Sequence, residues 1–93
     1  MAVTVLIPTP LRNLTGNEET VVVEASSISE LIEALEVAHP GIGVRLKTES
    51  GALHRFINFY VNEDDIRFLE GLETPLKSGD NVSIVPAIAG GNY

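Results

Sequence analysis

One short amphipathic helix, flanked on both sides by segments with the pattern of strands, limits most strongly what this chain can fold into. In residues 26–41, SSISELIEALEVAHPG, glutamates occupy one side of a helical pattern and apolar residues the other, at Ile28, Leu31, Ile32 and Leu35. Ser27 and Glu30 have the spacing of a capping box, and Pro40 ends the pattern. We therefore expect a single helix of about three turns.

The segment before the helix predicts a β-hairpin. Residues 2–8 alternate in the period of a strand, and Pro8 and Pro10 end that strand because proline cannot donate to a β ladder. A polar turn at 14–19 follows, and then the β-branched run 20–25. This run is expected to return antiparallel to the first strand.

After the helix, three further strands are expected: at 55–61, at 66–68 and at 81–87, the last ending near Pro86. Residues 41–54 have no clear period, and that segment is left unassigned, although Val44 and Leu46 would fit a short helical turn packed on the core. A helix-bearing crossover joins parallel neighbours, so the last strand should lie parallel to the first.

This order predicts an α+β fold of the β-grasp (ubiquitin-like) type, with a mixed sheet of four to five strands packed on one helix. The chain of 93 residues has room for one domain. We expect that domain at 1–86 and a flexible C-terminal tail with Gly-Gly at 87–93, because small residues cannot bury enough surface to stay ordered.

Alternation along the strands divides the side chains between two faces of the sheet. The face toward the helix should hold the core: Val3, Val5, Ile7, Val21, Val23, Ile57, Phe59, Val61, Val82 and Ile84, opposite Leu31, Ile32 and Leu35. The other face is unusually apolar for a wetted surface, with Leu6, Val22, Phe56, Tyr60 and Val85. Either Leu6, Phe56, Tyr60 and Val85 form a partner-docking surface, or residues 41–54 cover part of this face.

Composition excludes several classes of function. The chain has no cysteine, which removes disulfides, thiolate metal sites and cysteine nucleophiles. Its formal net charge of -7 argues against nucleic acid as a partner and favours a protein with a basic face, although ordinary solubility also explains the acidity. No apolar run could span a membrane and no signal peptide is evident, so we expect a cytoplasmic protein that does not bind membranes.

Catalysis by the chain itself is not expected. His39 lies at a helix end and His54 beside a strand start, and neither has a partner at the spacing of a triad or a metal pair. The acidic run 63–65 lacks the ligand spacing of a calcium loop and is interpreted as a solvated turn. We therefore predict no metal site, no catalytic residue and no bound cofactor.

The stretch AIAGG, directly after the last strand, is the part of the tail that points to a function. Together with LHRFINFYVNEDDIRF and NVSIVPAIAGG, it makes the whole chain resemble the MoaD/ThiS family of ubiquitin-like sulfur carrier proteins, and most closely the CysO-type carriers of cysteine biosynthesis. The resemblance implies that Gly91 carries the sulfur, with Gly90 and Ala89 as the tail that presents it.

The same resemblance implies the chemistry and the partners. An E1-like adenylyltransferase/sulfurtransferase would use ATP to adenylate the carboxylate of Gly91 and convert it to a thiocarboxylate. A PLP-dependent cysteine synthase would accept the sulfur, and a JAMM-type zinc metalloprotease would release the cysteine. Glycine suits this path because a residue without Cβ can thread a narrow channel.

Asn92 and Tyr93 depart from the family pattern, because with them attached Gly91 has no free carboxylate. The favoured explanation is proteolytic processing between Gly91 and Asn92. The alternatives are a carrier that has lost its activity and binds through the sheet face, and an incorrect terminus. A ubiquitin-like modifier conjugated through Gly91, a carrier like the molybdopterin synthase small subunit and a plain interaction module remain open as other functions.

Overall fold

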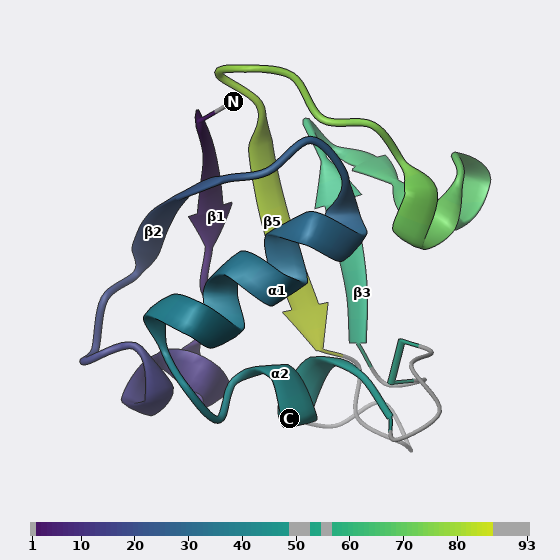
Figure 1. The fold of residues 1–93 in the computed structure, drawn as a ribbon. Coiled ribbons are helices and arrows are strands. Elements are labelled where there is room, and N and C mark those ends of the chain that lie inside the picture. The colour runs from purple at the N-terminus through teal and green to yellow at the C-terminus, as the bar shows by residue number, and fades with distance from the viewer. Residues whose placement is uncertain (1, 49–52, 55–56, 87–93) are drawn as a thin grey trace.

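The computed structural model describes residues 2–48, 53–54 and 57–86 of the chain. Five strands form one mixed sheet in the order β2-β1-β5-β3-β4 (Figure 1). They are β1 (Ala2–Leu6), β2 (Thr20–Glu24), β3 (Ile57–Val61), β4 (Asp64–Asp65) and β5 (Asn81–Pro86). The neighbours pair antiparallel except β1 and β5, which are parallel. The predicted β-grasp topology is therefore confirmed.

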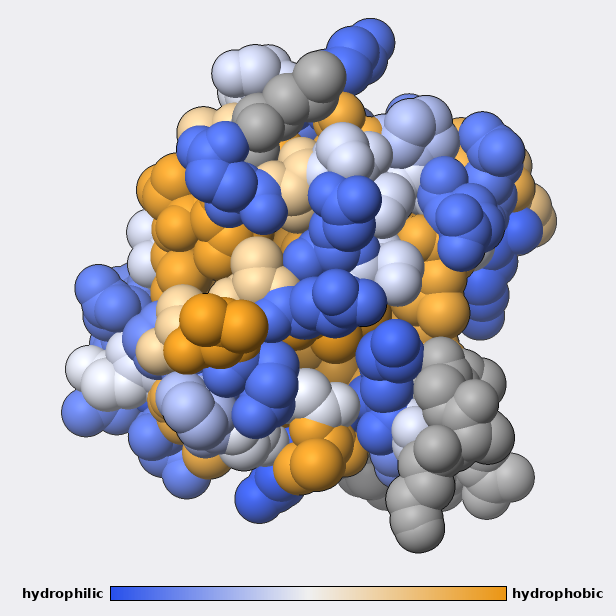
Figure 2. All heavy atoms as spheres, in the orientation of Figure 1, coloured by the Kyte–Doolittle hydropathy of each residue, from blue (hydrophilic) through white to orange (hydrophobic). Residues whose placement is uncertain are grey.

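One helix, α1 (Ile28–Ala38), crosses a single face of the sheet, and the short helix α2 (Gly43–Leu46) lies near the end to which β5 points (Figure 1). Three 3-10 turns complete the fold: η1 (Thr9–Leu14), η2 (Ile66–Phe68) and η3 (Gly71–Glu73). On the helix side, hydrophilic side chains cover much of α1, and hydrophobic ones lie among and beside them (Figure 2). We call the face of the sheet under α1 the inner face and the opposite one the outer face.

The predicted capping box is present in a shifted form. The Ser27 hydroxyl accepts a hydrogen bond from the Glu30 N–H at 3.2 Å, as expected of an N-cap. The Glu30 carboxylate, however, reaches Ser26, whose N–H and hydroxyl donate to it at 3.0 and 2.7 Å. These bonds, the hydroxyl first, lower the pKa of Glu30. At the other end of the helix, the His39 N–H donates to the Leu35 carbonyl at 2.7 Å.

The predicted core is confirmed, with Val21 and Ile57 only partly buried at its margin. Ile28, on the predicted apolar side of the helix, is also buried, and the structure adds buried apolar residues that were not expected in the core: Leu11, Ala25, Ile42, Ile66 and Leu76. In the segment left unassigned, Leu46 packs into the core from α2 as expected. Val44, one residue into α2, is exposed instead.

The predicted strand at 66–68 is wrong, because this segment is the turn η2. The pairing strand is β4, which begins directly after a two-residue turn in which Asn62 and Glu63 both have positive φ, 49° and 79°. The Asp65 carboxylate then accepts the Arg67 N–H at 2.8 Å, and this bond caps η2. A side chain that captures the backbone N–H two residues ahead competes with a β ladder, so pairing ends at Asp65.

Candidate functional site

The predicted reacting tail follows the central strand of the sheet. β5 lies between β1 and β3, and its last residue, Pro86, is opposite Ile57. The predicted sulfur-carrying and processing residues, Ala89, Gly90, Gly91 and Asn92, lie outside the described residues, so their roles stay predictions. The strand that precedes them pairs with β1 at residues 81–83 and with β3 at residues 82–86, so β3 alone holds its last residues.

Three of the four predicted docking residues share the outer face. Leu6 and Tyr60 lie in one cross-strand row through Ser83, and Val85 lies farther along β5. Phe56, the fourth, lies outside the described residues. Leu6 is 45% exposed and Val85 37%, and Val22 on the edge strand β2 is 65% exposed.

The buried side chains of residues 41–48 pack into the core and do not cover the outer face. Ile42 and Leu46 join the core cluster together with the buried residues of α1. The described part of the outer face therefore exposes apolar side chains of the kind that suit a protein partner, and its role in docking stays a prediction.

A fixed ion pair stands at one end of this face. Asp65 lies opposite Tyr60 across the β3–β4 pair and is only 8% exposed. Its carboxylate accepts the Arg67 Nε–H at 3.1 and 3.2 Å and the Nη2–H at 2.7 Å. The Arg67 guanidinium holds the pKa of Asp65 well below its ordinary value, with a smaller contribution from Asn58. In turn, Asp65 and then Tyr60 raise the pKa of Arg67.

Sequence analysis missed this pair, because residues 66–68 were assigned to a strand. The available signal was the spacing of an aspartate two residues before an arginine, directly after a polar turn.

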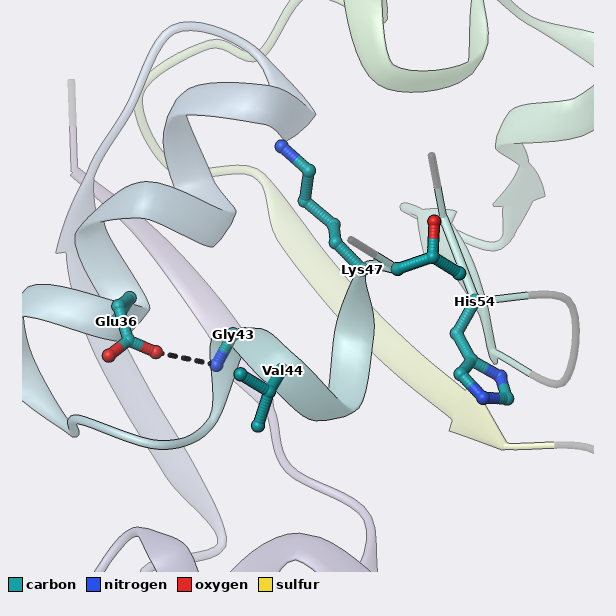
Figure 3. A pocket seen from close by; sticks show the side chains of 6 residues that line it. Glu36, Gly43, Val44, Lys47 and His54 are labelled. Carbon is teal, nitrogen blue, oxygen red and sulfur yellow. Dashed lines mark hydrogen bonds between the residues drawn. The ribbon is translucent and has the colours of Figure 1, made fainter. Parts of the chain in front are cut away.

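A shallow hollow of about 410 Å³ lies beside α2. Glu36, Gly43, Val44, Lys47, Thr48 and His54 line it (Figure 3). The Glu36 carboxylate is engaged with the backbone, because it accepts the Gly43 N–H at 2.7 Å and the Gly41 N–H at 3.1 and 3.2 Å. The Lys47 and His54 side chains point away from each other. The hollow does not bring together a nucleophile and a base.

Other groups considered for chemistry are also separated. Within the described ranges, no group of three or more His, Asp or Glu side chains could hold a metal ion. The acidic run divides between a turn, where Glu63 is exposed, and the ion pair of Asp65. A helix long and apolar enough to cross a membrane is also absent from the described part of the chain.

Comparison with known proteins identifies the family. The model of the ThiS family matches residues 5–91, which is nearly the entire chain. The chain belongs to the ThiS family.

Similar proteins include a sulfur carrier and a protein modifier. The sulfur carrier protein CysO of Mycobacterium tuberculosis is 47% identical over 93 residues, covering 98% of this chain and 100% of the relative. The small archaeal modifier protein 3 of Haloferax volcanii is 32% identical over 66 residues, covering 71% of each chain.

A solved structure agrees with this assignment. The Amycolatopsis orientalis BexX/CysO complex contains a chain that is 50% identical and superposes with a TM-score of 0.89, covering 96% of this chain and 99% of that one. The predicted resemblance to the MoaD/ThiS family and to its CysO type is therefore confirmed. In that complex, the similar protein is bound to another protein.

Proposed function

We propose that this chain is a sulfur carrier that delivers sulfur from the carbonyl carbon of Gly91 for cysteine biosynthesis. One observation carries the proposal: the family match extends to residue 91, through the Gly-Gly pair, in a chain 47% identical to CysO along its length. The central position of β5 supports it, because a strand paired with β1 at its start and with β3 up to Pro86 gives the tail a rigid base. In this proposal the chain is the substrate of enzymes and catalyses nothing itself.

The chemistry begins by freeing the Gly91 carboxylate, through hydrolysis of the Gly91–Asn92 peptide bond. The carboxylate then attacks the α-phosphorus of ATP on an E1-like adenylyltransferase, and pyrophosphate leaves. A hydrosulfide-equivalent sulfur attacks the resulting acyl carbon, AMP leaves, and the sulfur loses its proton to give the thiocarboxylate. Gly90 and Gly91 lack Cβ atoms, so they allow close approach to the reacting phosphate.

The proposed partners act on this thiocarboxylate in sequence. On a PLP-dependent cysteine synthase, the sulfur bonds to the β-carbon of an activated serine derivative, whose activated hydroxyl group leaves. The amine then attacks the resulting thioester and displaces the thiol, which leaves cysteine attached through its nitrogen to Gly91. A JAMM-type zinc metalloprotease hydrolyses that amide and regenerates the carboxylate. Because this protease cuts after Gly91, it also suits the removal of Asn92 and Tyr93. The location proposed for these reactions is the cytoplasm.

The test is the intact mass of the protein isolated from its own cells. We expect a chain ending at Gly91, with a fraction heavier by the exchange of one oxygen for sulfur. A mass that retains Asn92 under every sulfur supply would contradict the proposal. A Gly91→Ala variant should fold as the wild type does and fail to load sulfur; equal loading would also count against Gly91 as the carrier residue.

A second candidate function is conjugation of the matured chain to lysines of other proteins. It is favoured by the similarity to a small archaeal modifier protein, 32% identical over 66 residues. Peptide mass spectrometry of cell extracts should then find lysine side chains linked by isopeptide bonds to the Gly91 end. Free carrier without such adducts would leave sulfur transfer as the function.

A further inference from the structure

Arg67 places a positive charge at the edge of the outer face. The five strands contain no lysine or arginine. Arg67 reaches the edge of this face from η2, directly after β4, and its side chain is 69% exposed. Since the chain has 13 acidic and 6 basic residues, a cation held at this position is an exception to its charge pattern.

The guanidinium is oriented by the chain itself. Asp65 accepts its Nε–H and one Nη2–H, while the backbone N–H of Arg67 binds the same carboxylate. Tyr60 also contributes a hydrogen bond to the guanidinium, and because the side chain is 69% exposed, its outward N–H groups remain accessible to a partner. An arginine ordered in the free protein loses less conformational entropy on binding than a mobile one does, so this arrangement favours recognition.

The surroundings of Arg67 have the composition of an interface. One row of paired residues runs from Leu6 through Ser83 and Tyr60 to Asp65. Phe68, which follows Arg67 in η2, is 85% exposed. Aromatic residues and arginine dominate the binding energy of many interfaces. An exposed phenylalanine beside an oriented arginine is therefore a combination expected of a docking surface.

We propose that Arg67 is a specificity-determining residue of the outer face, and that it pairs with an aspartate or glutamate carboxylate on the enzyme that activates Gly91. This inference rests on the proposed function. The guanidinium fork matches a carboxylate in geometry and charge. The rest of the carrier is acidic and attracts basic groups, so a single acidic contact at Arg67 fixes the orientation in which the enzyme docks.

The experiment measures ATP–pyrophosphate exchange by the adenylyltransferase encoded in the same genome, with the chain ending at Gly91 as the varied substrate. For Arg67→Ala we expect a KM for the carrier raised by about tenfold, with kcat unchanged at saturation. The wild-type KM should rise with salt more steeply than that of the variant, because a charge pair is screened. Arg45→Ala, the same change at an exposed position on α2, is the matched control and should behave as the wild type.

Two further variants separate recognition from folding. Asp65→Asn keeps Arg67 but weakens its hold, so KM should rise less than in Arg67→Ala. Arg67→Lys keeps the charge without the fork and should also lie between the wild type and Arg67→Ala. Unchanged KM in Arg67→Ala, with exchange intact in the wild type, overturns this inference alone. No exchange with the wild-type chain removes the proposed activation and this inference together.

Discussion

The two faces of the sheet are built from the same strands, yet the described helices and turns cover only one of them. On the inner face, Val5, Phe59 and Val82 are fully buried beneath α1 and its neighbouring turns. On the outer face, Leu6, Val22 and Val85 remain exposed although their side chains are just as apolar. The difference comes from the connections: α1, and α2 with Ile42 and Leu46, pack against the inner side.

This contrast shows that strand composition alone does not determine burial. A face becomes core only when a connection returns over it with apolar side chains of its own. In this chain the helical connection lies on one side, so the other side keeps an apolar surface that a partner can use. Substitutions on the two faces should therefore separate stability from binding.

The largest expected effect is on the inner face. Phe59→Ala removes a fully buried aromatic side chain, and we expect the free energy of unfolding to fall by about 3–5 kcal/mol. For a small domain this is a large part of the total stability, which is of order 5–15 kcal/mol. Urea denaturation measures the loss. Tyr60→Phe, on the next residue and the outer face, should change stability by less than about 0.5 kcal/mol.

A loss below about 1 kcal/mol in Phe59→Ala would show that the inner face is not closely packed. It would also remove the physical basis of the contrast between the two faces.

A matched pair of isosteric changes compares the faces directly. Val82→Thr places a hydroxyl in the fully buried inner face, which should cost about 1–3 kcal/mol. Val22→Thr makes the same change at an exposed position of β2, where threonine suits a strand, and should stay within about 0.5 kcal/mol of the wild type. Thermal and urea unfolding measure both. Equal losses would mean that the outer face is covered in solution.

A smaller effect is expected where the cover of the inner face is anchored. Glu36 joins α1 to the N-terminal end of α2 through the Gly41 and Gly43 N–H groups (Figure 3). Glu36→Ala should lower the free energy of unfolding by about 1–2 kcal/mol, because those N–H groups lose a charged acceptor. Glu33→Ala, one turn earlier and exposed, is the control. If both variants lose the same amount, the Glu36 bonds do not hold α2 in place.

The Glu36 contact also illustrates which part of the fold could not be predicted from the sequence. The hairpin, α1 and the inner-face core were predicted because each depends on a local period that Val3, Val5 or Leu31 displays directly. Ile42 was not predicted, because it lies between Gly41 and Gly43, whose N–H groups bind a carboxylate from the preceding helix. A bond between a side chain and the backbone of the next segment leaves no periodic pattern in the sequence.

The site divides in the same way. The outer-face positions of Leu6, Tyr60 and Val85 followed from alternation, because a side-chain period of two assigns every residue of a strand once one face is known. The Asp65–Arg67 pair was missed because an apolar Ile66 between two polar residues fits a strand as well as a turn. Capture of the Arg67 N–H by Asp65 selects the turn.

The smallest expected effect concerns acid, and it comes from polar groups rather than from the core. Hydrogen bonds donated by Arg67 lower the pKa of Asp65, and those donated by Lys77 and Asn62 lower the pKa of Asp80. A carboxyl group with a lowered pKa in the folded state stabilises the fold above its unfolded pKa of about 4. That contribution is lost as the pH falls through the folded-state pKa. We therefore expect the thermal midpoint to hold near neutral pH and to decline below about pH 4.

The variant Asp65→Asn tests how much of this decline in the thermal midpoint comes from the ion pair on the outer face. At neutral pH the variant should be slightly less stable than the wild type, because its amide lacks the charge that Arg67 binds. As the pH falls, the wild-type carboxylate is protonated and loses the same interaction, so the two curves of midpoint against pH should converge. Asp64→Asn, an exposed neighbour, should instead give a curve parallel to that of the wild type. A curve for Asp65→Asn that stays parallel to the wild-type curve down to low pH would show that the charge of Asp65 does not hold Arg67. The orientation proposed for the guanidinium would then have no physical basis.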